Sequence, residues 1–262
     1  WLQSLPTDIT FYEIELVSAD NAIAIAFEAS RQLKDNELNV LMEGLQSLSE
    51  TPIQCWWKVG KNGQFQQLGE GADELYLKVS GKLKFFFEPG QFIQVNGEIN
   101  TKMVDQMLRL VSPSSSGVAV DLFCGAGNLS LPLTRQFDQV IGIEGLESLV
   151  AGAAKNAIEN KITTAQFFTA DLTQKNSLNK IKQIPKSLDL VVLDPPRSGA
   201  LDIMPWIAKS GAKQVIYISC HPSTMARDAK YLLDAGYKLK DLGVLDMFPH
   251  TAHVEAMALF EK

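Results

Sequence analysis

The sequence predicts an α/β protein in which a small α+β domain precedes a doubly wound parallel sheet. From residue 118 onward, short apolar runs alternate with helical patterns, the order typical of parallel strands joined by right-handed crossovers. Before residue 90, alternating segments meet at turn residues, which indicates antiparallel hairpins. The segments 238–247 and 253–260 leave no room for a helix between them. We therefore expect an antiparallel hairpin to close the sheet edge.

The composition is that of an ordinary globular chain. Its 262 residues are 46% hydrophobic and 21% charged, which suffices for two domains, placed at 1–89 and 90–262. We expect a cytoplasmic protein, because no apolar run is long enough to span a membrane and no signal peptide is visible. The chain begins at Trp1 without a methionine, so we expect further sequence upstream. The net charge of -6, which comes from the first 89 residues, argues against a simple basic nucleic-acid binder.

Residues 1–89 contain the elements of a mostly antiparallel α+β unit. A hairpin is predicted over 11–30 and a helix over 35–48, where leucines recur at helical spacing. Two further hairpins turn at Asn62-Gly63 and at Ser80-Gly81. Five aromatic residues of these strands are predicted to fill the core rather than to stack on nucleobases: Trp56, Trp57, Phe85, Phe86 and Phe87.

The second domain opens with a helix and continues as the alternating part of the chain. Ile99, Met103 and Met107 share one helical face, and the polar loop 112–117 ends that helix. The predicted strands are 118–123, 139–144, 165–169, 188–193 and 214–219. The predicted helices lie near 129–136, 146–160, 201–209 and 222–235.

The central strand meets the carboxylate of Asp121 and then a glycine turn at Gly125 and Gly127. This is the sequence form of a nucleotide-binding crevice in a Rossmann-like sheet. Ser130 stands where the dinucleotide motif has its third glycine, so that motif is incomplete. Glu144 ends the next strand and is placed to hydrogen-bond ribose hydroxyls. A ligand with a ribose and no pyrophosphate, such as S-adenosylmethionine, fits this pattern; a turn with a purely structural role is the alternative.

Three further positions carry chemically suitable side chains. Asp194 follows a strand, and Pro195-Pro196 after it fix a rigid loop that presents the carboxylate to the crevice. Cys220 lies two residues before Pro222, a favoured first residue of a helix. A helix amino end favours the thiolate, so we predict a nucleophile. Glu255 opens an apolar strand, where burial would raise its pKa and suit general acid-base work.

The other cysteines and the histidines predict no metal site. Cys55 and Cys124 lie in apolar strand or turn sequence and are predicted to be structural. Three cysteines without a C-x-x-C pair suit a reducing compartment. The spacing of Cys220, His250 and His253 fits no familiar zinc ligand set.

Four motifs of residues 90–262 resemble the uracil-5 RNA methyltransferases, the family that makes 5-methyluridine in transfer and ribosomal RNA. They are DLFCGAGN, LDPPRSGA, ISCHPSTMARD and DMFPHTAHVEAMALF, in this order. FIQVN and DMFPHTAHVE are similar to the bacterial 23S ribosomal RNA branch. Residues 1–89 resemble the variable central domain of that family only loosely. The family usually has asparagine in place of His221, and its β-barrel RNA-binding domain and four-cysteine iron-sulfur site have no counterpart in this sequence.

The resemblance implies a methyltransferase fold and an enzyme that moves a methyl group from S-adenosylmethionine to carbon 5 of a uridine in RNA. The substrate would be 23S ribosomal RNA, with tRNA as the alternative. Cys220 would add to carbon 6 of the uracil, and Glu255 would remove the proton from carbon 5. Asp194 would hydrogen-bond the uracil or orient the methyl donor. The cofactor pocket would be lined by Gln94, Phe123, Gly125, Gly127, Asn128, Glu144, Asp171 and Asp194. We expect a monomer that binds RNA and no membrane.

Three rival interpretations come from other classes of protein. A non-catalytic RNA-binding module would keep the fold without turnover, but the intact Cys220 and Glu255 argue against it. A nicotinamide-dependent oxidoreductase is disfavoured by Ser130 and by the closing hairpin. A 5-methylcytidine enzyme would also use a cysteine nucleophile, and the FPHTAHVE segment favours uracil instead.

Overall fold

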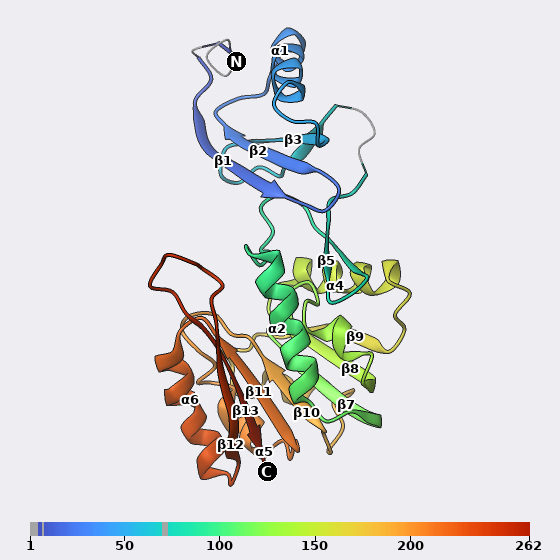
Figure 1. The fold of residues 1–262 in the computed structure, drawn as a ribbon, viewed down its shortest axis with the longest axis vertical. Coiled ribbons are helices and arrows are strands. Elements are labelled where there is room, and N and C mark those ends of the chain that lie inside the picture. Colours follow the sequence, from blue (N-terminus) through green and yellow to red (C-terminus); the bar gives the residue numbers. More distant parts are fainter. Residues whose placement is uncertain (1–4, 7, 70–72) are drawn as a thin grey trace. The chain divides into compact units, whose positions relative to one another are not determined.

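A computed structural model of the chain describes residues 5–6, 8–69 and 73–262 (Figure 1). The described residues form two compact units. The first unit comprises Trp1–Lys78 together with Phe86–Ile93, and the second comprises Val79–Phe85 together with Gln94–Lys262. The chain therefore crosses between the units more than once, and each unit is described separately.

The first unit is a four-stranded sheet with one helix. Its strand order is β1-β2-β3-β4, with β2 and β3 parallel and the outer pairs antiparallel. The predicted first hairpin and helix are confirmed. Strands β3 and β4 pair antiparallel on either side of the second predicted turn, and their connection begins at Gly60, which has a φ of +64°. The elements are β1 (Phe11–Ser18), β2 (Ile23–Ala29), α1 (Asp35–Gln46), β3 (Ile53–Val59) and β4 (Gln66–Leu68).

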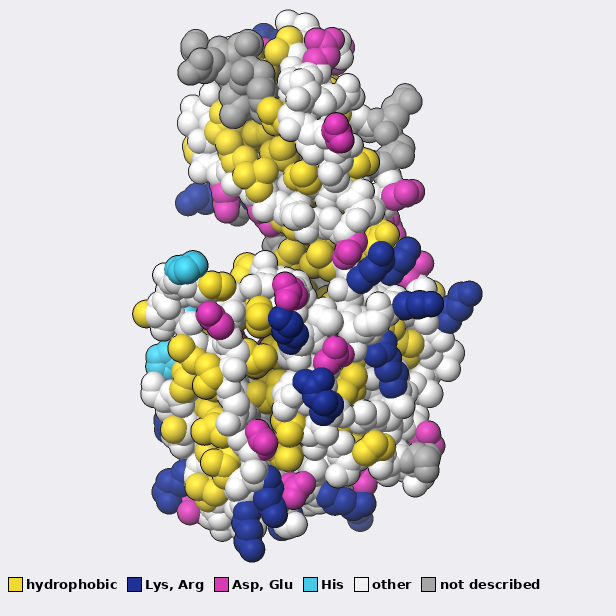
Figure 2. Space-filling view, in the orientation of Figure 1, with side chains coloured by type: hydrophobic (Ala, Val, Ile, Leu, Met, Phe, Trp, Pro, Cys, Tyr) yellow, Lys and Arg dark blue, Asp and Glu magenta, His cyan; other side chains and the backbone are white. Residues whose placement is uncertain are grey.

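Aromatic side chains fill much of the core of this unit. The Trp57 ring lies 5.8 Å from the Phe11 ring and 5.7 Å from the Phe27 ring, and its Nε1 donates a hydrogen bond to the Arg31 carbonyl. Of the five aromatic residues predicted to fill the core, three are buried (Trp57, Phe85 and Phe87) and two are only half-buried (Trp56 and Phe86). The outer side of β1 is different, because Tyr12, Ile14 and Leu16 are exposed there; hydrophobic side chains are visible over this strand in Figure 2.

The hairpin of β5 (Tyr76–Val79) and β6 (Leu83–Phe86) is confirmed, and its tip belongs to the second unit. Ser80 at the tip is buried, and its hydroxyl donates a hydrogen bond of 2.6 Å to Asp105 in helix α2. The same hydroxyl accepts a hydrogen bond of 2.9 Å from Arg135. Polar contacts thus hold the residues around Ser80 within the second unit.

The second unit contains a seven-stranded sheet in the order β12-β13-β11-β10-β7-β8-β9. Neighbours from β11 to β9 are parallel, while β13 is antiparallel to both β11 and β12, so the predicted closing hairpin is confirmed. The strands are β7 (Ser114–Leu122), β8 (Phe137–Glu144), β9 (Ala165–Thr169), β10 (Leu190–Leu193), β11 (Gln214–Ser219), β12 (Lys238–Leu245) and β13 (Glu255–Glu261). The helices are α2 (Gly97–Leu110), α3 (Ser130–Leu133), α4 (Glu147–Glu159), the 3-10 helix η2 (Ser177–Lys180), α5 (Met204–Lys209) and α6 (Pro222–Asp234).

Strand β7 and helix α3 differ most from the prediction in length. Strand β7 begins at Ser114, inside the predicted polar loop, because Ser114 pairs with Phe137 before the register shifts. Helix α3 is shorter than predicted. Pro132 lies inside it and cannot donate a backbone hydrogen bond, and the chain leaves the helix at Thr134 through bonds of the 3-10 type.

Both faces of the sheet are covered at its centre, which explains why β10 is apolar throughout. Leu190 and Val192 of β10 pack into one core cluster with α2 and α3, whereas Val191 and Leu193 pack into the other with α5 and α6. Alternate residues of a strand point to opposite faces, so this division follows from the pleat. Within the described part of the chain, no helix is both long and apolar enough to cross a lipid bilayer.

A buried carboxylate fixes the loop that follows β10. Asp228 of α6 is fully buried and accepts hydrogen bonds from the Ala200 backbone N–H at 2.7 Å and from the Tyr217 hydroxyl at 2.8 Å. Its other oxygen accepts from Arg227 Nε at 2.8 Å. The adjacent Gly199 has a φ of +79°, and a Cβ there would lie 2.5 Å from Asp228 Oδ2. The loop therefore takes one conformation beside the amino end of α6.

Replacing Asp228 by alanine should lower the free energy of unfolding by about 3 kcal/mol or more, because it leaves buried donors unsatisfied. Urea denaturation followed by circular dichroism measures this loss. Asp234→Ala is the matched control on the same helix, since this exposed residue has Lys230 as its one ion-pair partner among the described residues. It should change stability by less than about 0.5 kcal/mol. Equal effects of the two variants would contradict the role of the Asp228 contacts.

Candidate active site

The register of three strands brings three of the predicted side chains to one edge of the sheet, the edge at which its parallel strands end. Ser219 of β11 lies opposite Ala256 of β13, so Cys220, which follows β11, lies beside Glu255, the first residue of β13. Strand β10 is parallel to β11 and ends at Leu193, so Asp194 emerges at the same edge. A thiol and two carboxyl groups from separate parts of the sequence therefore share one site.

The two carboxyl groups of this cluster are hard to ionise. Glu255 is only 5% exposed, and burial, followed by the charge of Asp194, raises its pKa to about 7. Burial also raises the pKa of Asp194 to about 6. Water is scarce at this edge and like charges disfavour each other, so the site retains protons that a solvated carboxyl group would lose. The prediction of a raised pKa for Glu255 agrees with this environment.

The prediction of a readily ionised Cys220 is not confirmed. Helix α6 does begin at Pro222, as predicted, but the pKa of the Cys220 thiol is raised rather than lowered. Burial is the largest cause, and the charges of Glu255 and Asp194 add to it, while Arg197 acts in the opposite direction. Burial together with the neighbouring carboxyl groups thus makes this thiol harder to ionise than its place before a helix predicts. Cys220 is partly exposed, in contrast to the buried Cys55 and Cys124.

The predicted glycine turn follows β7 and uses left-handed backbone. Gly125 and Gly127 have φ values of +53° and +95°. Among the described residues, no atom lies within 4 Å of a Cβ built on Gly125, so the turn is open on that side. Phe123 has a φ of +63°, which costs energy for a residue with a side chain and marks a constrained position at the strand end.

Glu144 lies at the end of β8 and holds the glycine turn. One of its carboxylate oxygens accepts a hydrogen bond from the Gly125 N–H at 3.1 Å. The other accepts from the N–H groups of Gly145 at 2.6 Å and Leu146 at 3.2 Å. A carboxylate has about four acceptor positions, so Glu144 keeps capacity for a ligand hydroxyl.

Buried amides support the same turn, and the sequence analysis missed two of them. Asn128 and Asn100 exchange hydrogen bonds of 2.8 and 2.9 Å, which ties the turn to helix α2. Asn156 of helix α4 donates to the Ala126 carbonyl at 3.1 Å. Asn100 and Asn156 are buried polar residues on the apolar faces of their helices. A polar residue in such a position is the sequence signal that would have identified them.

Asp121 is the buried carboxyl group beneath the turn. It is fully buried; Ser130 donates a hydrogen bond to its Oδ2, and its Oδ1 has no partner among the described residues. Burial raises its pKa to about 7, and the charges of Asp194 and Glu144 add to the effect. Ser130, which breaks the dinucleotide motif, is thus the hydrogen-bond donor to this carboxyl group.

Two predicted cofactor residues are not joined to this cluster by any described contact. Asp171 is exposed after β9, and its carboxylate accepts hydrogen bonds from Thr173 and Gln174 in its own turn, which lower its pKa. Gln94 is half-buried just before α2, and no hydrogen bond of its side chain appears among the described contacts. Their role in ligand binding remains a prediction.

The histidines near the site are at the surface. His250 and His253 are exposed in the segment between β12 and β13, and histidine side chains are visible on the surface in Figure 2. Arg197 Nη2 lies 3.2 Å from His253 Nδ1, so the loop after β10 contacts this segment. Among the residues that the structure describes, no group of three or more histidine, cysteine, aspartate or glutamate side chains is arranged to hold a metal ion.

The fold is that of known methyltransferases. It matches the structure of the Pyrococcus abyssi tRNA (uracil-54, C5)-methyltransferase in complex with S-adenosyl-L-homocysteine, with a TM-score of 0.74 and 23% identity over 94% of this chain and 59% of that one. It also matches M. jannaschii TYW2 in complex with AdoMet, with a TM-score of 0.58 and 15% identity over 95% of this chain and all of that one. These likenesses establish a Rossmann-like methyltransferase fold.

A family model described as tRNA (Uracil-5-)-methyltransferase matches residues 7–262, and the chain belongs to this family. It is 40% identical over 249 residues to the 23S rRNA (uracil(1939)-C(5))-methyltransferase RlmD of Vibrio parahaemolyticus, covering 95% of this chain and 55% of that protein. It is 47% identical over 217 residues to the protein of the same name from Pseudomonas putida, covering 83% of this chain and 47% of that protein. The chain thus spans about half the length of these relatives.

The raised pKa of Glu255 predicts how stability depends on pH. The pKa of Glu255 is near 4.5 in the unfolded chain and about 7 in the folded chain. Ionisation of Glu255 therefore lowers the free energy of unfolding as the pH rises from about 4.5 to about 7. Glu255→Gln removes that cost. The variant should gain stability over the wild type, by at most about 3 kcal/mol, between pH about 5 and pH about 8.

Urea unfolding of both proteins across this pH range measures the gain. Glu159→Gln, at an exposed position near the end of α4, is the control for a carboxyl group in water. A difference between Glu255→Gln and wild type that stays constant with pH would contradict the retention of this proton.

Proposed function

We propose that this protein transfers a methyl group from S-adenosylmethionine to carbon 5 of a uridine in RNA through a covalent adduct with Cys220. The observation that carries the proposal is the pairing of β11 with β13, which puts Cys220 beside Glu255 at the edge where Asp194 emerges. Membership of the uracil-5-methyltransferase family supports the choice of reaction.

The reaction assigns a distinct task to each side chain. Carbon 5 of uracil is a poor nucleophile until the Cys220 thiolate adds to carbon 6 and places electron density on carbon 5. Carbon 5 would then bond to the methyl group, whose bond to the positively charged sulfur of the cofactor breaks and leaves a neutral thioether. Glu255 takes the proton from carbon 5, and the electrons of that bond expel the thiolate and restore the pyrimidine. A carboxyl group with a pKa of about 7 suits such a proton transfer near neutral pH. Asp194 would hydrogen-bond the uracil or orient the methyl donor.

The residues around the glycine turn fit the cofactor. S-adenosylmethionine, when bound, supplies an electrophilic methyl group on a positively charged sulfur. The charges of Asp194 and Glu144 act on Asp121 at this edge, and such a cluster of carboxyl groups favours a cationic ligand. Glu144 would accept hydrogen bonds from the ribose hydroxyls, and Gly125 leaves the backbone open to a close approach. The proposed lining of the cofactor pocket also includes Phe123, Gly127, Asn128, Gln94 and Asp171.

The names of relatives suggest the RNA. The relatives at 40% and 47% identity are named as 23S rRNA methyltransferases, so we propose 23S ribosomal RNA as the substrate, with tRNA as the alternative suggested by the family description. Residues 90–262 would carry the catalysis and residues 1–89 would form a separate central domain. All three cysteines are free thiols, which supports a reducing, cytoplasmic location.

The covalent step gives the sharpest test of this function. Glu255→Gln should accumulate a protein–RNA adduct, since the proton on carbon 5 is no longer removed and the thiolate cannot leave. The adduct is measured as a shifted band on a denaturing gel after incubation with S-adenosylmethionine and a 23S or a tRNA transcript in separate reactions.

Cys220→Ala should abolish both methylation and the adduct, alone and combined with Glu255→Gln, while S-adenosylmethionine still binds. Methylation by the Cys220→Ala variant would refute the role of Cys220 as the nucleophile. If Glu255→Gln gave only free RNA and no adduct, Glu255 would not be the base. If the adduct formed with the tRNA transcript but not with the 23S transcript, the substrate would be tRNA rather than 23S ribosomal RNA.

Glu144 provides a test of the cofactor pocket. Glu144→Ala should weaken S-adenosylmethionine binding about 10- to 150-fold in isothermal titration calorimetry, the range expected for loss of a hydrogen bond to a charged acceptor. Glu147→Ala, at the exposed start of α4, should leave binding unchanged. Unchanged affinity in the Glu144 variant, with a normal unfolding curve, would show that the pocket is misplaced.

A further inference from the structure

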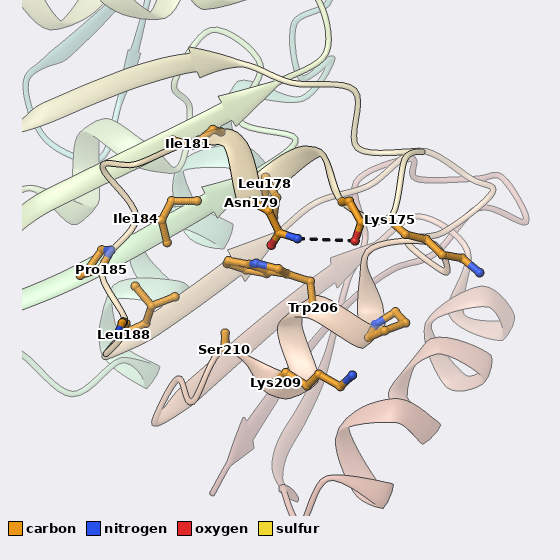
Figure 3. A pocket seen from close by; sticks show the side chains of 13 residues that line it. Lys175, Leu178, Asn179, Ile181, Ile184, Pro185, Leu188, Trp206, Lys209 and Ser210 are labelled. Carbon is orange, nitrogen blue, oxygen red and sulfur yellow. Dashed lines mark hydrogen bonds between the residues drawn. The ribbon is translucent and has the colours of Figure 1, made fainter.

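A pocket with no proposed role lies between residues 175–188 and helix α5 (Figure 3). Its volume is about 620 Å³. The wall includes Trp206, three lysines and the side chains of Asn176 and Asn179. None of its lining residues belongs to the cluster of Cys220, Glu255 and Asp194 or to the glycine turn. It is therefore a separate feature of the second unit.

The pocket lies in a basic part of an acidic chain. Residues 172–188 contain four lysines and no acidic residue, although the whole chain has a net charge of -6. The four lysines are exposed, as is Lys209 on α5, and none of these five forms an ion pair with another described residue. The flanking carboxylates are engaged elsewhere, because Asp171 accepts from its own turn and Asp189 pairs with Lys213 at 2.7 Å. The local positive charge is available to an anionic ligand.

Trp206 gives the pocket a fixed aromatic wall. Its ring packs against the core cluster that also contacts Ile181 and Ile184, yet it is only partly buried and lines the pocket. In Figure 3 the indole lies across the middle of the pocket, with Asn179 on one side and Ser210 on the other. Asn179 Nδ2 is 3.5 Å from Asn176 Oδ1, a weak hydrogen bond that leaves the amides free to bond the polar edge of a ligand.

We propose that this pocket binds an unpaired nucleotide of the RNA substrate that is not the target uridine. The base would stack on Trp206 and the phosphates would lie among Lys175, Lys186 and Lys209. Aromatic rings beside lysines are the features by which proteins hold single-stranded nucleic acid without reading its sequence. The proposal rests on the proposed function, which makes RNA the substrate.

The pocket lies along segments that lead away from the candidate active site. Its first lining residue, Lys175, follows shortly after the carboxyl end of β9, and α5 follows the loop that begins at Asp194. Both segments lead from the edge that holds the candidate active site to the amino ends of β10 and β11. A strand whose target base has left its stack has neighbouring nucleotides that need a binding surface.

The aromatic contribution is tested with two substitutions of Trp206. Trp206→Leu keeps an apolar side chain against the core but removes the stacking face, whereas Trp206→Phe keeps an aromatic ring. Binding of fluorescein-labelled oligouridine, measured by fluorescence anisotropy, should weaken about 5- to 150-fold in the leucine variant and remain close to wild type in the phenylalanine variant. S-adenosylmethionine binding and thermal unfolding report whether each variant is folded. Equal oligouridine affinity of folded leucine and phenylalanine variants would overturn the stacking role.

The charge contribution is tested by the salt dependence of the same binding. Replacing Lys175, Lys186 and Lys209 together by glutamine should reduce the slope of log affinity against log salt by about 1.4, because the two phosphates that flank one nucleotide each contribute about 0.7 on a single strand. Lys238→Gln, on the exposed edge strand β12, is the control and should leave the slope unchanged. An unchanged slope in the triple variant would overturn the phosphate site.

The outcomes separate this inference from the proposed function. Normal oligouridine binding by the pocket variants, together with a Cys220-dependent adduct, would refute the pocket and leave the methyl transfer intact. Loss of oligouridine binding by the pocket variants in a protein that methylates no RNA would support the pocket and refute the chemistry.

Discussion

The antiparallel pairing of β13 with β11 is the constraint on which the candidate site depends. It places Glu255, the first residue of β13, beside Cys220, the residue that follows β11. The thiol and the carboxyl groups then share a region with little water, where each negative charge disfavours the others. All three groups consequently hold their protons to a higher pH than they would in water, an effect of burial and of neighbouring charge.

The glycine turn is held in place before any ligand arrives. Glu144 accepts a hydrogen bond from the Gly125 N–H, Asn100 and Asn128 bond each other, and Asn156 donates a hydrogen bond to the Ala126 carbonyl. These contacts come from three different elements and fix an otherwise strained backbone. Rigid support of this kind reduces the conformational entropy that the protein loses when a ligand binds, since the site needs little rearrangement.

Much of the fold was predictable from local patterns. The alternation of strands and helices, the hairpin turns and the closing hairpin all follow from periodicity and from glycine and proline positions, and each was found near its predicted bounds. The segment after α2 was harder, because Ser114 pairs in β7 through a neighbour distant in sequence. The buried Asn100 and Asn156 were missed because their partners lie on other elements.

The sequence by itself determined which residue types stand at the strand ends, including Asp194, Cys220 and Glu255, because strand boundaries follow from local preferences. The tertiary structure decided their electrostatics. The pKa of Cys220 is raised, against the expectation from its helix, because burial and two carboxyl groups act on it through space. The pocket at Trp206 likewise forms only when residues 175–188 fold against α5. Burial and proximity depend on packing between segments that are distant in the chain, and no local pattern encodes them.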